Sequence, residues 1–234
     1  MPTIAELPDV PVISEVREDR RGKDSAIVIK MVETRYRRGN PREESLKNEL
    51  VVRYTLEPYR VVSTLRICES GFAEVRIPAH DSRLGYSSEA HALFAKLAGL
   101  VNETSFEPLS IETLKQGLWD RSRRAEFAPI FAFRHSRFQN PLGTRMDVAG
   151  TQGTDLADDT DLVSGIDAFR RNPVDVYVDR ASVALKHEGS NGIMSRDISL
   201  VFTGREHEFS VFESVDRDEY EFILAMILKL SQIE

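Results

Sequence analysis

The clearest hydrophobic pattern in the chain lies in its C-terminal quarter, residues 174–234. Apolar and polar residues alternate over 174–186, 198–203 and 209–211, and short turns are indicated at 189–192 and 204–206. Alternation with a period of two is typical of half-buried strands. Connections this short favour antiparallel pairing, because parallel strands need a long crossover. The pattern therefore predicts an antiparallel meander of three strands.

A buried helix is predicted to follow this meander, over residues 216–233. Asp216 and Glu219 have the spacing of a capping box, with Asp in place of the usual Ser or Thr. Residues 222–228 are apolar on nearly every side, which is typical of a helix in a core or a subunit interface. The run is too short to cross a bilayer, which takes about 20 residues. We expect most of it to be core, with Leu224 buried, and keep a homo-oligomer through this helix as a hypothesis.

The N-terminal part of the chain shows a similar order of elements. Strands are predicted near 26–31, 50–54, 61–68 and 72–77, with breaks at residues 39–41 and at Pro58. A helix is predicted over 88–102, because its apolar residues recur at spacings of three and four. Residues 66–103 and 199–233 both read as strand, Gly turn, strand, connection and helix. Two similar meander-plus-helix units are one interpretation, and coincident topology is the other.

The middle of the chain is more varied. A helix is predicted over 110–124, a strand over 130–133, a long mobile loop over 139–154 and a short helix over 161–171. The fold class is therefore α+β, with antiparallel meander sheets packed with helices. We expect an N-terminal unit at 1–105, a connecting segment at 106–172 and a C-terminal unit at 173–234. These segments can also form one compact domain.

Composition narrows the classes of function. The 234 residues are 41% hydrophobic and 29% charged, the usual balance of a globular protein, with a net charge of −7. Cys68 is the single cysteine, so an internal disulfide is excluded, and its apolar neighbours indicate a buried thiol. The N-terminus has no basic start and no apolar run, so a signal peptide is not expected. The expected location is the cytoplasm, with no membrane association.

A basic island stands out against this acidic background. Residues 115–145 hold seven basic and two acidic residues, a net charge of +5, which leaves −12 for the rest of the chain. Aromatic residues are interleaved with the basic ones, and Arg with exposed aromatics is a combination that binds phosphates and unpaired bases. The alternative is that the aromatics are core and the arginines are solvated. The candidate anion-binding or nucleic-acid-binding residues are Arg121, Arg123, Arg124, Arg134, His135, Arg137, Phe138 and Arg145.

The acidic segment that follows offers a different chemistry. Asp155, Asp158, Asp159 and Asp161 could hold a hard cation, although their spacing is not that of an EF-hand. The alternatives are a solvated acidic loop that caps the next helix, or a loop that pairs with the preceding arginines. No two histidines have the spacing of a helical zinc pair, and glycine-rich phosphate loops are absent. We therefore predict no resident metal or cofactor and no catalytic residues.

Three hypotheses for function follow. The first is a non-catalytic binding module in a larger assembly, whose arginine-aromatic surface binds an anionic partner, either nucleic acid or an acidic protein face. The second is a metal-dependent hydrolase or nuclease that uses the 155–161 loop. The third is a structural protein that forms oligomers.

Overall fold

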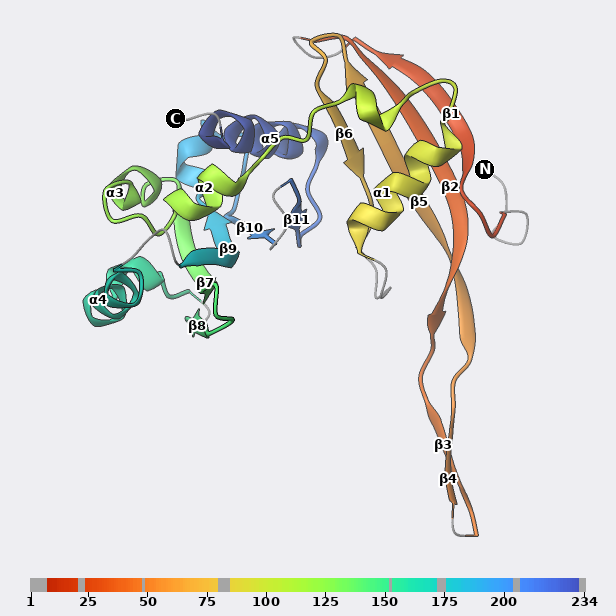
Figure 1. Ribbon diagram of the computed structural model, residues 1–234. Coiled ribbons are helices and arrows are strands. Elements are labelled where there is room, and N and C mark those ends of the chain that lie inside the picture. Colours follow the sequence, from red (N-terminus) through yellow and green to blue (C-terminus); the bar gives the residue numbers. More distant parts are fainter. Residues whose placement is uncertain are drawn as a thin grey trace. The chain divides into compact units, whose positions relative to one another are not determined.

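The structure is a computed structural model that describes residues 8–20, 24–47, 49–79, 85–151, 153–171, 176–203 and 207–231 (Figure 1). Antiparallel sheets packed with helices build the fold, so the predicted α+β class is confirmed. The chain divides into two compact units, residues 1–107 and residues 108–234. No helix in the described ranges has both the length and the apolar character needed to cross a membrane.

The first unit is a four-stranded antiparallel sheet with one long helix. Its strand order is β1 (Val12–Asp19), β2 (Ala26–Arg38), β5 (Leu56–Cys68) and β6 (Ala73–Arg76). Helix α1 (Tyr86–Lys96) packs against the sheet, where its Leu93 and the residue that follows the helix, Leu97, meet Ile29, Met31 and Leu65. A 3₁₀ turn, η2 (Glu103–Ser105), follows the helix. The alternation of apolar residues along β2 and β5 accounts for this core, because every second side chain faces the helix.

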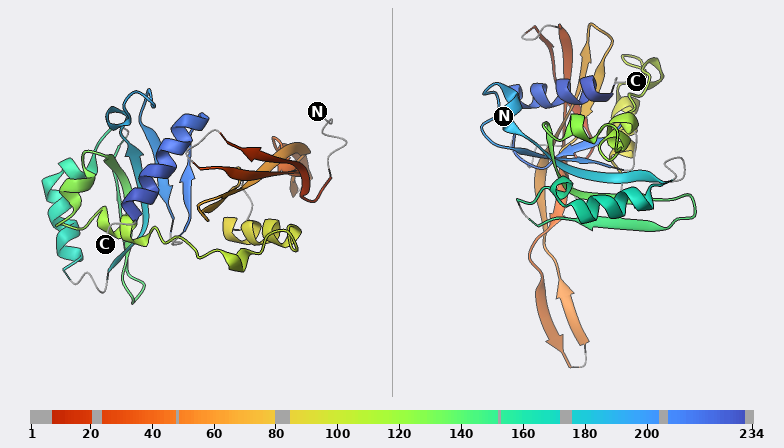
Figure 2. Two further views of the ribbon diagram at one scale, coloured as in Figure 1. Left: turned by 90° about the horizontal axis from the view of Figure 1, so that it is seen from above. Right: turned by 90° about the vertical axis from the view of Figure 1, so that its left-hand side faces the viewer.

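A two-stranded hairpin extends from this sheet. Strands β3 (Arg42–Leu46) and β4 (Glu49–Arg53) continue the β2–β5 pair beyond the four-stranded sheet (Figure 2). Residues 39–41 lie opposite residues 54 and 55, so the first strand carries an extra residue, as in a β-bulge. A Cβ on Gly39 would lie 2.5 Å from the Thr55 hydroxyl oxygen, so a larger residue at this position would require the Thr55 side chain to shift. We call residues 37–57 the hairpin arm.

Two boundaries in the first unit differ from the sequence prediction. Pro58 does not interrupt its strand, because β5 pairs with β2 from Cys68 through to Leu56. Proline is tolerated there because β6 pairs with β5 only at residues 64–67, so the other edge of β5 is unpaired at Pro58. Helix α1 ends at Lys96 rather than near residue 102, and Gly99 follows with a φ of +95°, a backbone conformation that favours glycine.

The second unit is a five-stranded antiparallel sheet. Its order is β11 (Phe209–Val211), β10 (Ile198–Phe202), β9 (Tyr177–Leu185), β7 (Phe131–Gln139) and β8 (Arg145–Ala149). The predicted C-terminal meander is confirmed by β9, β10 and β11, while Val174 and the turn at 204–206 lie outside the described residues. Because β7 pairs with β9, the segments 106–172 and 173–234 share one sheet. The sheet orders of the two units differ, and the proposed repeat is not confirmed.

Helices and 3₁₀ turns pack around this sheet. They are α2 (Glu112–Gly117), α3 (Arg124–Phe127), η3 (Leu156–Asp158), α4 (Thr160–Phe169), η4 (His187–Ser190) and α5 (Arg217–Ser231). The capping box of α5 is confirmed, since Glu219 N donates to Asp216 Oδ1 at 2.9 Å and Asp216 N donates to Glu219 Oε2 at 3.0 Å. Ile223, Ile227 and Leu230 then place one side of α5 in the core.

Two predictions for the middle of the chain were wrong. The expected helix at 110–124 is broken into α2 and α3, because the Asp120 carboxylate accepts hydrogen bonds from Ser122 N and Oγ at 2.8 and 2.6 Å. A side chain that bonds to a nearby backbone N–H competes with the helix in this way. The expected loop at 139–154 contains strand β8, whose Val148 is buried in the core.

Candidate functional site

The aromatic residues of the basic island form part of the core. Trp119, Phe127, Phe131, Phe133 and Phe138 are each 0–1% exposed. The Trp119 indole nitrogen donates to Ser136 Oγ at 2.6 Å, and its ring lies 5.8 Å from that of Phe138. Stacking on a base needs an accessible ring face. Phe138 therefore offers no stacking surface in this structure.

The candidate residues on β7 and β8 are engaged with other residues of the same unit. Arg137 forms an ion pair with Asp179, and His135 Nε2 lies 3.5 Å from Asp147 Oδ1. Arg145 Nε donates to Gln139 Oε1 at 3.2 Å, and Arg134 Nη1 donates to the Thr154 carbonyl at 2.6 Å. His135 and Arg137 alternate along the strand with two buried residues that face the helices, Ser136 and Phe138, so they lie on the opposite face of the sheet.

The candidate residues on α3 and beside it lie in a different place. Arg124 Nη2 forms an ion pair with Asp167 Oδ1 at 2.7 Å, and its side chain is only 13% exposed. Its guanidinium lies 5.6 Å from the ring of Trp119, and that of Arg123 lies 5.1 Å from the ring of Phe127. Arg121 is exposed in the turn before α3. The eight candidate residues therefore do not form one continuous surface.

A third arginine, which the sequence analysis did not select, joins Arg123 and Arg124. Arg170, just after α4, lies with its guanidinium 6.0 Å from the ring of Phe138. It interacts electrostatically with Asp120 and Asp167, and also with Arg124. We call Arg123, Arg124 and Arg170 the arginine cluster. The basic island contains only residues that are close together in the sequence, at 115–145. Arg170 lies outside that range and is brought to Arg124 by the fold.

Burial and the neighbouring charges shift the pKa values of groups in and beside the arginine cluster. Burial lowers the pKa of Arg170 and the neighbouring Arg124 lowers it further, although Asp120 and Asp167 both act in the opposite direction. The pKa of Asp120 is lowered chiefly by the hydrogen bond from the Ser122 hydroxyl, with Arg170 and Arg123 contributing. Within the described part of the chain, Arg170 forms no ion pair, and its buried Nε has no hydrogen-bond acceptor. The cationic form of Arg170 is thus held in a place where it is incompletely compensated.

The acidic segment after β8 has a structural role. Asp155 accepts hydrogen bonds from the backbone N–H groups of Phe133 and Ala157 at 2.9 and 3.1 Å. Asp159 caps α4 by accepting from Leu162 N at 2.9 Å. Among the described residues, no three His, Cys, Asp or Glu side chains are placed to share a metal ion. Two of the four carboxylates proposed as metal ligands therefore already serve to order the backbone.

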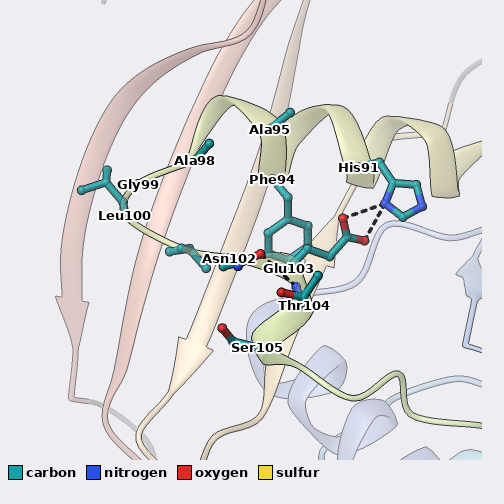
Figure 3. Close-up of a pocket in the computed structure, with 11 residues that line it drawn as sticks. His91, Phe94, Ala95, Ala98, Gly99, Leu100, Asn102, Glu103, Thr104 and Ser105 are labelled. Atoms are coloured by element: carbon teal, nitrogen blue, oxygen red, sulfur yellow. Dashed lines mark hydrogen bonds and ion pairs between the residues drawn. The ribbon is translucent and has the colours of Figure 1, made fainter.

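A hollow in the first unit is formed by the end of α1 and the segment that follows it (Figure 3). His91 Nδ1 lies 2.7 Å from Glu103 Oε2 at one side of the hollow. The ring of Phe94 lies between that pair and residues 98–100. The His91 side chain is 64% exposed, so the pair is solvated. All the described lining residues come from 91–105, and His91 and Glu103 are the ionisable side chains among them.

Comparison of the chain with protein-family models, with characterised proteins and with solved structures gave no match. The functional assignment therefore depends on the geometry and charge of the chain itself.

Proposed function

We propose that this chain is a binding module that recognises an acidic protein partner through the arginine cluster, within a larger assembly. The observation that carries the proposal is Arg170, a partly buried guanidinium without an ion-pair partner in the described residues. An incoming carboxylate would relieve the repulsion between Arg170 and Arg124 and accept charge-assisted hydrogen bonds, which are stronger than neutral ones.

The geometry favours a protein partner over nucleic acid. The aromatics that would stack on bases are buried in the core. Arg137 lies on the other face of the sheet, and both Arg134 and Arg137 are bonded within the same unit, so the arginine cluster is not continued by a long basic track on β7. Neutralising many successive phosphates requires such a track. Arg123 and Arg124 already pair with Glu126 and Asp167, so a single incoming acidic side chain at Arg170 matches the arginine cluster better.

The proposal is tested with a fluorescently labelled oligoglutamate peptide, measured by anisotropy at low salt. The double variant Arg123→Gln/Arg170→Gln is compared with Arg145→Gln, which removes a charge from β8 outside the arginine cluster. We expect the double variant to bind at least about tenfold more weakly, since one charge-assisted hydrogen bond contributes about 1.5–3 kcal/mol. Arg145→Gln should bind like the wild type.

Single-stranded and duplex DNA serve as competing probes. Tighter binding to DNA than to the peptide, with affinity falling steeply as salt rises, would replace the acidic protein partner by nucleic acid. If the wild type binds neither probe, or if both variants bind equally well, the arginine cluster is not a binding site. Circular dichroism of each variant shows whether a lost affinity reflects lost folding.

A further inference from the structure

The hairpin arm leaves both edges of a two-stranded sheet without a partner. Among the described residues, β3 and β4 pair only with each other. Every residue of β3 and all but one of β4 are exposed. An isolated hairpin is marginally stable in water, whereas three or more strands give a stable sheet. Natural proteins usually protect such edges, because unpaired N–H and C=O groups are a template for another strand.

The β4 strand exposes apolar side chains to solvent, which is unfavourable at an unpaired sheet edge. Leu50 is 66% exposed and Val52 is 40% exposed, and both lie on the same face of the strand. Glu49, Val51 and Arg53 lie on the other face. The strand thus has an acid at one end, a base at the other end and three aliphatic residues between them.

This order of residues is complementary to itself when reversed. If two β4 strands pair antiparallel about Val51, Glu49 of each copy lies opposite Arg53 of the other, and Leu50 lies opposite Val52. Opposite charges and apolar pairs at directly facing positions stabilise antiparallel strands. Arg53 is available for this contact, because its present partner Glu44, at 3.3 Å, forms only an exposed ion pair with it.

The other edge of the hairpin arm is not complementary to itself when it pairs about its own centre. Antiparallel self-pairing of β3 about its centre would place Glu44 directly opposite its own counterpart. A shift of the centre toward Glu43 would place Glu43 opposite Glu44. Like charges at facing positions are destabilising. Paired about its own centre, the β4 edge is therefore better suited to a second copy of the same strand than the β3 edge.

We infer that the β4 edge of the hairpin arm is a dimerisation surface, at which the β4 strands of two copies of this chain pair antiparallel about Val51. The contact is isologous, so the same patch serves both copies and the assembly closes as a dimer. Four strands then form one sheet, which joins the two arms. This surface is independent of the arginine cluster.

Two charge reversals test the inference in the full-length chain. Glu49→Arg alone places Arg opposite Arg in a homodimer, and Arg53→Glu alone places Glu opposite Glu. An equimolar mixture of the two variants restores both opposite-charge pairs in the heterodimer. Sedimentation velocity should show a dimer for the wild type, a monomer for each variant alone and a dimer for the mixture. The mixture also serves as the folding control, because misfolded variants would not restore the dimer.

A covalent probe checks the register. Val51→Cys should form an intermolecular disulfide under mild oxidation, whereas Glu44→Cys on the other edge should not; the native Cys68 is buried, at 7% exposure. A wild type that is monomeric at all concentrations would overturn the inference. So would a dimer that neither charge reversal weakens, because it would form through another surface.

Discussion

The indole nitrogen of Trp119 donates a hydrogen bond of 2.6 Å to the hydroxyl oxygen of Ser136, and both residues are 1% exposed. The bond ties the segment after α2 to the centre of β7. It also satisfies the polar atom of a large buried ring, which would otherwise lose its hydrogen bond to water. The aromatic side chains between the arginines therefore form part of the hydrophobic core of the second unit.

This bond gives the first prediction. Ser136→Ala should lower the free energy of unfolding by about 1–3 kcal/mol, because it leaves the indole N–H buried and unsatisfied. Ser164→Ala is the matched control, since Ser164 is exposed on α4 and should change stability by less than about 0.5 kcal/mol. Urea denaturation followed by tryptophan fluorescence measures both. Equal midpoints for the two variants would show that the indole bond contributes nothing.

The pair of His187 and Asp197 should make stability depend on pH. The hydrogen bond to Asp197, with an Nδ1–Oδ1 distance of 2.7 Å, raises the pKa of His187 above its ordinary 6.5. Burial acts to raise the pKa of Asp197, but hydrogen bonds from the His187 ring and backbone outweigh it and lower that pKa below 3.8. The contribution of His187 to the free energy of unfolding is therefore fully present below pH 6.5 and is lost as the pH rises through its raised pKa. The contribution of Asp197 to the free energy of unfolding is lost only at low pH, as the pH falls through its lowered pKa.

The second prediction follows from those signs. His187→Gln should lower the melting temperature more at pH 5.5 than at pH 8.5, where the wild-type imidazole has lost its charge. The difference in melting temperature between the wild type and His187→Gln is taken at each pH, so the effect of the other histidines, which both proteins share, cancels. A direct NMR titration should place the His187 pKa above 6.5. A variant whose deficit is the same at both pH values would mean that the ion pair does not stabilise the fold.

The sequence was most informative where a pattern is local. The Asp216–Glu219 capping box and the β9–β11 meander depend on short spacings, and both are present. The break of the helix at Asp120 was missed, because a single side chain-to-backbone bond there competes with a periodic pattern. The arginine cluster could not be predicted, since Arg170 reaches Phe138 only through the tertiary fold. Likewise, an alternation of charge and aromatic residues cannot show which ring faces are buried.

The third prediction concerns the core position of α5. Leu224 is 7% exposed, whereas its neighbour Ala225 is exposed on the same helix. Leu224→Asp places a carboxylate where it has to be buried without a partner, and we expect a loss of stability of more than about 2 kcal/mol. Ala225→Asp introduces the same charge at a solvated position one residue away, so it should cost only the lower helix propensity of Asp, about 0.7 kcal/mol. Both variants add the same residue and the same charge to one helix, so the change in net charge cancels and the helix-propensity costs differ by only a few tenths of a kcal/mol, about the difference between Leu and Ala. Thermal unfolding followed by circular dichroism measures the two together. If Leu224→Asp melts at the wild-type temperature, burial of the Leu224 side chain does not stabilise the fold.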